Sequence, residues 1–142
     1  MNKEEVKAYL STCVAAQRAV KRLEEDIAQI RAEKMSIRHI VDGMSHASGY
    51  SDLSDYAAKL DELERKLIQA RYKRVTIYTE VFDRIERIED ETEKELLTYR
   101  YLKGNTWEQI ADKMLYCVTQ VHRIHNNALV HLGDMWQNVT RI

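Results

Sequence analysis

Apolar residues recur every seven positions along the first part of the chain. Between residues 6 and 41 they follow spacings of three and four, and charged side chains fill most of the other positions. One core position holds Val6, Cys13, Val20, Ile27, Lys34 and Val41, and the other holds Tyr9, Ala16, Leu23, Ile30 and Ile37. A seven-residue repeat with a charged outer face predicts a long helix that must pack against a partner helix.

A second stripe follows a short polar interruption. Residues 43–51, GMSHASGYS, predict a loop in which Ser51 is the N-cap of the next helix. That helix is expected from about Asp52 to about Asp90. Its apolar positions are Leu53, Tyr56, Leu60, Leu63, Leu67, Ala70, Ile77, Val81, Ile85 and Ile88, with Arg74 as a polar interruption. Folding the chain about residue 47 sets residue i opposite residue 94 − i, which predicts an antiparallel hairpin; pairing between chains in a four-helix bundle would bury the same stripes.

Residues 86–95, ERIEDETEKE, are mostly acidic and carry little apolar content. We interpret them as a solvated helical boundary, with an acidic contact surface as the alternative. The boundary separates a helical hairpin over residues 1–90, its loop at 43–51, from a small domain over residues 91–142.

The end of the chain has the pattern of three short helices. The first has its apolar side at Leu96, Leu97, Tyr99, Tyr101 and Leu102 and is expected to end near Gly104. The second opens with Thr106 and Gln109 in the T-x-x-Q spacing of a capping box. Its buried face comprises Trp107, Ile110, Ala111 and Met114. Trp107 is expected to pack in the core rather than to stack on a base.

Residues 115–117, Leu-Tyr-Cys, form the predicted turn before the third helix. Its apolar stripe is Val118, Val121, Ile124, Ala128, Leu129 and Leu132, and Gly133 is expected to end it. His125 is expected at the edge of this stripe. The opposite side carries Thr119, Gln120, His122, Arg123, Asn126 and Asn127. Two short helices joined by a tight turn, with one polar face on the second, predict a helix–turn–helix that presents this face to the major groove.

The local charge around the predicted helix–turn–helix supports DNA binding. The whole chain has a net charge of −1, which offers no general attraction to nucleic acid. Between Lys113 and Gly133, however, there is no Asp or Glu in a chain that contains 23 of them. Arg suits guanine, and Asn or Gln suits adenine. We therefore predict base contacts by Gln120, His122, Arg123 and Asn126, and phosphate contacts by Lys113, Thr119 and Asn127.

The segment 98–132 resembles region 4 of bacterial sigma factors and, more closely, phage-encoded regulators of the ArpU/RinA type. The matching residues are Arg100, Tyr101, Gly104, Thr106, Trp107, Glu108, Ile110, Ala111, Val121, Arg123, Ile124, His125, Ala128 and Leu129. The loop residues Met44, Ser45, His46 and Ser48 to Asp52 also resemble that phage family. The resemblance implies an all-α chain, in which a long antiparallel hairpin precedes a three-helix, sigma-4-like helix–turn–helix domain. It implies a transcriptional regulator, an activator, in a phage or prophage of a Gram-positive bacterium.

The turn departs from the family pattern. The family usually has glycine, then an aromatic or small residue, then serine, where this chain has Leu115, Tyr116 and Cys117. Leucine tolerates positive φ poorly, and cysteine is a weak N-cap. We expect either a different turn geometry or a cost of about 1 kcal/mol in local stability.

The same module also fits two other functions. A DNA-packaging subunit like a small terminase, or a sigma-like protein that docks on RNA polymerase, would also use such a module. No acid–base, nucleophile or phosphate-loop motif is present, so neither an enzyme nor a cofactor is expected. The cluster at residues 71–74, Arg-Tyr-Lys-Arg, is interpreted as a solvated helix surface, with phosphate contact as the alternative.

The cysteine spacing and the lack of a long apolar run predict the compartment, and the arginine content predicts the assembly. Cys13 and Cys117 lie far apart and predict reduced thiols, without a disulfide or zinc site. His122 and His125 are three residues apart but have no third ligand nearby, so no metal is expected. No signal-like segment and no long apolar run occur, which predicts a protein of the bacterial cytoplasm that makes no membrane contact. With a single Arg in the predicted reading helix, we expect a homodimer on double-stranded DNA.

Overall fold

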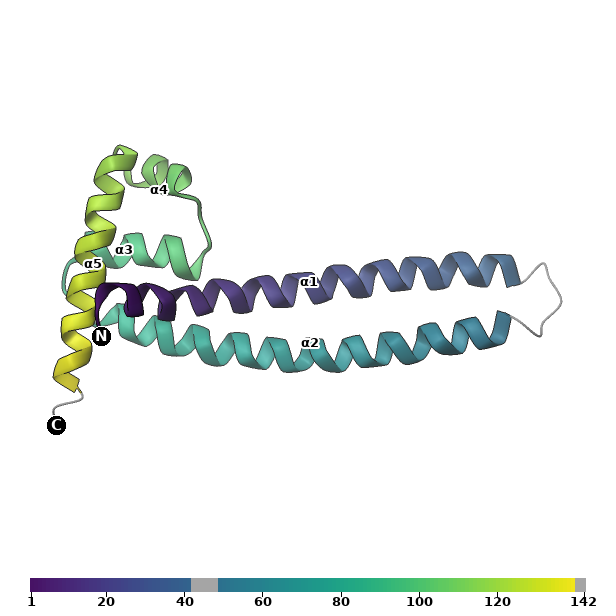
Figure 1. The fold of residues 1–142 in the computed structure, drawn as a ribbon. Coiled ribbons are helices and arrows are strands. Elements are labelled where there is room, and N and C mark those ends of the chain that lie inside the picture. Colours follow the sequence, from purple (N-terminus) through teal and green to yellow (C-terminus); the bar gives the residue numbers. More distant parts are fainter. Residues whose placement is uncertain (42–48, 140–142) are drawn as a thin grey trace. The chain divides into compact units, whose positions relative to one another are not determined.

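The structure, a computed structural model, describes residues 1–41 and 49–139, and every regular element in them is a helix. The elements are α1 (Lys3–Val41), α2 (Gly49–Glu86), α3 (Glu91–Leu97), the π-helix η1 (Thr98–Leu102), α4 (Trp107–Met114) and α5 (Val118–Val139) (Figure 1). The all-α prediction is confirmed. No helix among the described residues is long and apolar enough to cross a membrane. Most of the loop predicted at residues 43–51, with Met44, Ser45, His46 and Ser48, lies outside the described residues.

One compact unit, residues 17–74, is a helical hairpin. Its buried residues are Val20, Ile27, Leu63 and Leu67, all predicted stripe positions. Ion pairs join α1 to α2 across the outside, between Arg31 and Glu64 at 2.7 Å and between Glu24 and Arg71 at 3.1 Å. These pairs lie one residue from the expected 94 − i register, which confirms antiparallel pairing within the chain. They are half-exposed, so apolar burial stabilises the hairpin more than they do.

The other compact unit joins residues 1–16 to residues 75–139. Its core combines the start of α1 and the end of α2 with the helices that follow them. It contains Val6, Leu10, Cys13, Val81, Ile85, Ile88, Leu96, Leu97, Tyr101, Leu102, Ile110, Ala111, Val121, Ala128, Leu129 and Leu132. This grouping differs from the division at residue 90 expected from the sequence. Leu10, which lies outside the predicted heptad positions, is fully buried in this core.

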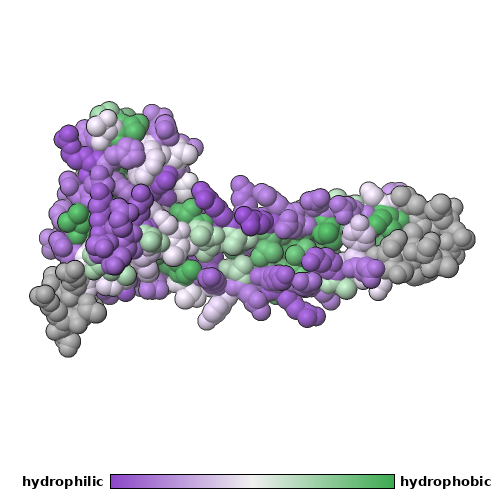
Figure 2. All heavy atoms as spheres, in the orientation of Figure 1, coloured by the Kyte–Doolittle hydropathy of each residue, from purple (hydrophilic) through white to green (hydrophobic). Residues whose placement is uncertain are grey.

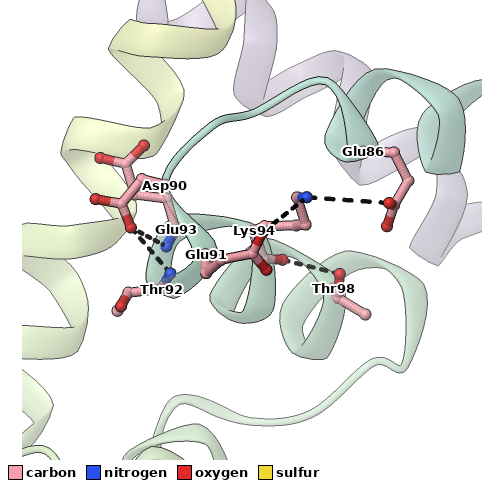
Figure 3. A network of polar contacts seen from close by, with 7 residues as sticks. All are labelled: Glu86, Asp90, Glu91, Thr92, Glu93, Lys94 and Thr98. Carbon is pink, nitrogen blue, oxygen red and sulfur yellow. Dashed lines mark hydrogen bonds and ion pairs between the residues drawn. The ribbon is translucent and has the colours of Figure 1, made fainter.

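The junction between α2 and α3 corrects one predicted helix end. α2 ends at Glu86 rather than near Asp90. The Asp90 carboxylate instead caps α3, accepting hydrogen bonds from the backbone N–H groups of Thr92 (2.9 Å) and Glu93 (3.1 Å) (Figure 3). Lys94 binds Glu91 at 3.2 Å and approaches Glu86 at 4.0 Å. An aspartate that satisfies two free N–H groups starts a new helix and does not end the old one.

Two further predicted helix ends are also wrong. α2 begins at Gly49, so Ser51 lies inside the helix and is not its N-cap. Gly133 does not end α5, which continues to Val139. A Cβ at Gly133 would lie 2.5 Å from the Met1 carbonyl oxygen, so this glycine allows close packing against the N-terminus.

Three aromatic and cationic side chains join the ends of α1, α2 and α5. The rings of Tyr9 and Trp136 meet edge to face, with centroids 4.6 Å apart. The Arg84 guanidinium lies 3.4 Å from the Trp136 centroid and 5.6 Å from that of Tyr9. Burial, with the nearby Glu80 carboxylate, raises the pKa of Tyr9 to about 12. These contacts and the shared core explain why the first residues group with the last helices.

Candidate nucleic-acid interface

The segment before α4 makes a sharp, ordered turn. α3 widens into the π-helix η1, where the Lys103 N–H donates to the Thr98 carbonyl at 3.0 Å, five residues back. Gly104 then has a φ of 71°, as the prediction of a helix end there requires. The Asn105 N–H closes the turn on the Tyr99 carbonyl at 2.9 Å. The chain therefore leaves η1 in one defined direction.

The predicted capping box at the start of α4 is confirmed. Thr106 Oγ1 accepts from the Gln109 N–H at 3.2 Å, and Gln109 Oε1 accepts from the Thr106 N–H at 3.0 Å. Ile110 and Ala111 are buried on the inner side of this helix. Trp107 is half-buried and packs against the same core, as expected. α4 is therefore held at its N-terminus and along its inner face.

The turn between α4 and α5 contains the single non-glycine residue with positive φ among the described residues. Leu115 has φ 59° and ψ 40°, and its N–H donates to the Ala111 carbonyl. The Tyr116 N–H donates to the same carbonyl at 3.1 Å. The structure shows the second of the two outcomes expected for this turn: a left-handed residue that costs local stability. Leu115 is 89% exposed, so no core packing offsets the strain.

Leu115→Gly is therefore expected to stabilise the protein by about 1 kcal/mol, because glycine occupies the left-handed region without the Cβ clash. Part of that gain is lost to the greater freedom of glycine in the unfolded chain. Urea unfolding monitored by circular dichroism measures the change. Cys117→Gly, two residues on and also exposed, is the control, and an equal gain there would contradict the assignment of strain to Leu115.

The buried side of α5 follows the predicted stripe. Val121, Ala128, Leu129 and Leu132 are at most 2% exposed, whereas Val118 at the first turn is 37% exposed. His125 corrects the prediction, since it lies inside the core and not at its edge, with only 4% of its surface exposed. The stripe attaches α5 firmly to the helices beneath it: Figure 1 shows α3 beside the middle of α5 and α4 beside its N-terminal end.

His125 and Tyr101 share a buried hydrogen bond. The Tyr101 hydroxyl oxygen lies 2.7 Å from His125 Nε2. Burial, helped by the positive charges of Lys7 and Arg100, lowers the pKa of His125 to about 4. Burial also raises the pKa of Tyr101 to about 12. Both groups are therefore neutral at pH 7, and their polar atoms satisfy each other within an apolar core.

The opposite side of α5 is open to solvent. All seven residues predicted to contact DNA are exposed: Lys113, Thr119, Gln120, His122, Arg123, Asn126 and Asn127. Thr119, Arg123 and Asn126 recur at spacings of four and three, so they share one helix face. His122 lies on this face too, because it is three residues after Thr119. The acid-free run from residue 113 to residue 133 includes all seven of these residues.

One member of this face is held by an aromatic neighbour. The rings of His122 and Trp107 lie 4.6 Å apart, and the Trp107 ring also meets His125 at 4.7 Å. The Arg100 guanidinium stacks on Trp107 at 4.2 Å and donates to the Asn105 carbonyl at 3.1 Å. The sequence did not indicate this stack. His122 is therefore backed by a ring that is itself fixed from both sides.

The acidic run occupies a different side of the same unit. Glu93 is only 5% exposed, and its Oε2 lies 2.8 Å from Nδ1 of His131. Hydrogen bonding and the charge of Glu93 raise the pKa of His131. A hollow of about 380 Å³ lies here, lined in part by Glu89, Asp90, Glu93 and Asp134. The run is mostly exposed, as a solvated boundary should be, but Glu93 links α3 to α5.

The histidines, cysteines and the 71–74 cluster have the following places in the part of the chain that the structure describes. It brings together no three His, Cys, Asp or Glu side chains that could hold a metal ion. Cys13 is buried and Cys117 exposed, and neither forms a disulfide. In the 71–74 cluster, Arg71 pairs with Glu24. No family model, curated protein or solved structure matches the chain.

Proposed function

We propose that this protein is a sequence-specific DNA-binding regulator of phage or prophage transcription, an activator, acting in the cytoplasm of a bacterial host. The exposed face of α5 is the reading surface. One observation carries the proposal: a helix fixed by its buried side presents only neutral and basic polar side chains on its other side between residues 119 and 127. A rigid, acid-free helix face suits the negatively charged major groove.

Each exposed residue has a role set by its chemistry. Arg123 donates two hydrogen bonds to guanine, and Gln120 and Asn126 pair with adenine edges. His122 reads a neighbouring base from the position that Trp107 gives it. Lys113, Thr119 and Asn127 contact phosphates and set the register of the helix in the groove.

Assembly and polymerase contact complete the proposal. With one arginine on the reading face, a single copy makes few charge-assisted contacts. A homodimer on two half-sites would double them and add specificity. Activation would then follow from contact with host RNA polymerase by surfaces away from α5.

Arg123→Ala is expected to weaken binding to the preferred sequence by about 1–3 kcal/mol, which is roughly 5- to 150-fold. Fluorescence anisotropy on DNA selected from random sequence by the wild-type protein measures this at fixed salt. Arg22→Ala removes an exposed arginine far from α5 along the chain and is the matched control. It should bind as the wild type does.

Two outcomes would contradict the proposal. Selection might enrich no sequence at all, in which case α5 does not read bases. Alternatively, Arg123→Ala and Arg22→Ala might weaken binding equally, which would indicate a general charge effect and not a guanine contact.

A further inference from the structure

α2 carries a second apolar stripe, separate from the one that pairs with α1. Ile68, Tyr72, Val75 and Phe82, with Thr79 between the last two, follow spacings of four, three, four and three along this helix. With Tyr78 beside them, the apolar members are between 38 and 77% exposed. Tyr78 and Phe82 stack with ring centroids 6.3 Å apart. Figure 2 shows that hydrophobic and hydrophilic residues both reach the surface along the two long helices. Spacing of this kind is that of a helix that packs against another helix.

The stripe is symmetric about Val75. Ile68 lies seven residues before this position and Phe82 seven after it, while Tyr72 and Tyr78 lie three before and three after. If two copies of α2 pair in antiparallel orientation, Val75 meets Val75 on the two-fold axis. Each Ile68 then meets a Phe82, and Tyr72 and Tyr78 lie at matching levels on the two flanks of the interface. Such self-complementarity is what a two-fold interface requires.

Charge favours this orientation over the parallel one. Arg65, on the flank of the stripe, lies ten residues before Val75, and the acids Asp83 and Glu86 lie eight and eleven after it; all three are exposed. Antiparallel pairing brings the Arg65 of one copy beside the Asp83 and Glu86 of the other, twice in the dimer. Parallel pairing would instead set each residue against its own copy, Arg65 against Arg65 and Asp83 against Asp83. Like charges facing each other destabilise an interface.

We propose that the exposed stripe of α2 is the dimer interface of this protein, and that its occupant is the same stripe of a second copy in antiparallel orientation. The dimer would supply the second reading helix that the proposed function calls for. The proposed interface does not depend on DNA binding, because the exposure, symmetry and charge of the α2 stripe support it without reference to α5.

Light scattering of the full chain tests the interface. We expect a dimer for the wild type, and Val75→Lys should raise the dimer dissociation constant about tenfold or more, because two lysines then meet on the axis. Gln69→Lys adds the same charge to an exposed position of α2 off the stripe and should leave the dimer intact. Since Val75 is 64% exposed in the single chain, Val75→Lys should keep its helical circular dichroism spectrum.

Cysteine crosslinking in a Cys117→Ser background tests the orientation. Val75→Cys should form a disulfide-linked dimer on oxidation. Ile68→Cys and Phe82→Cys should crosslink when mixed but not alone. Crosslinking of Ile68→Cys alone would overturn the antiparallel pairing.

A wild-type monomer, a ring of eight or more subunits, or an unchanged dimer with Val75→Lys would overturn the interface itself. None of these results bears on whether α5 reads DNA sequence, which the DNA-selection experiment tests separately.

Discussion

Acidification from pH 7.5 to pH 5 is expected to lower the free energy of unfolding by about 2 kcal/mol through His125 alone. The pKa of this histidine falls from 6.5 in the unfolded chain to about 4 in the folded protein. Below pH 6.5 the unfolded chain therefore binds a proton that the folded protein does not accept until about pH 4. Stability is lost as the pH falls through this window, because protonation favours the unfolded state.

His131 acts in the opposite sense. Its pKa is raised in the folded protein by Glu93. The contribution of that pair is fully present below the unfolded pKa and is lost as the pH rises through the folded pKa. The His131 side chain is 59% exposed, so solvent screens the pair and its effect is smaller than that of His125.

Urea unfolding at a series of pH values isolates the effect of His125. His125→Gln keeps a side chain that can accept from the Tyr101 hydroxyl but does not titrate. It should be less stable than the wild type at pH 7.5, because the ring packing is lost, yet its stability should change less between pH 7.5 and 5. If both proteins lose stability equally over this range, His125 is not the group responsible.

Leu129→Ala is expected to destabilise the protein by about 2–5 kcal/mol, the range for removing a buried leucine side chain from a packed core. Leu129 is fully buried and shares its core with α1, α2, α3 and α4. The loss is large beside the 5–15 kcal/mol that stabilises a typical domain. The chemical unfolding midpoint measures it.

Val130→Ala is the matched control, since Val130 is the next residue of α5 and is 47% exposed. It should change stability by no more than about 0.5 kcal/mol. Comparable losses in the two variants would show that α5 is not attached through the Leu129 side. DNA binding, measured where both variants are folded, should be retained by each, because neither side chain is among the seven proposed to contact DNA.

The long helices could be predicted because their signal is repeated many times. Each heptad position from Val6 to Ile37 contributes to one periodic pattern, and an error at one position, such as the polar Lys34, does not obscure it. Helix ends carry no such repetition. Asp90, Ser51 and Gly133 were each interpreted from a single residue, and each assignment was wrong. Thr106 was correct because a second residue, Gln109, supported it.

The candidate site also combines features that the sequence could predict with features that it could not. The exposed face of α5 follows from helical periodicity alone, since the apolar stripe determines which residues point away from the core. The stack of Arg100, Trp107 and His122 does not, because these residues lie on three different elements. The same holds for the bond between Tyr101 and His125. No local pattern in the sequence could have indicated that they meet.

The sequence by itself determined the long helices, their apolar stripes and the polar face of α5, because each follows from spacing along one helix. Only the tertiary structure decided where the core lies. Val6, Leu10 and Cys13 at the start of α1 pack with the C-terminal helices, and Gly133 admits the Met1 carbonyl beside α5. Periodicity shows that a side chain needs a partner but not which one, since burial lowers the free energy equally well against any apolar surface of matching shape.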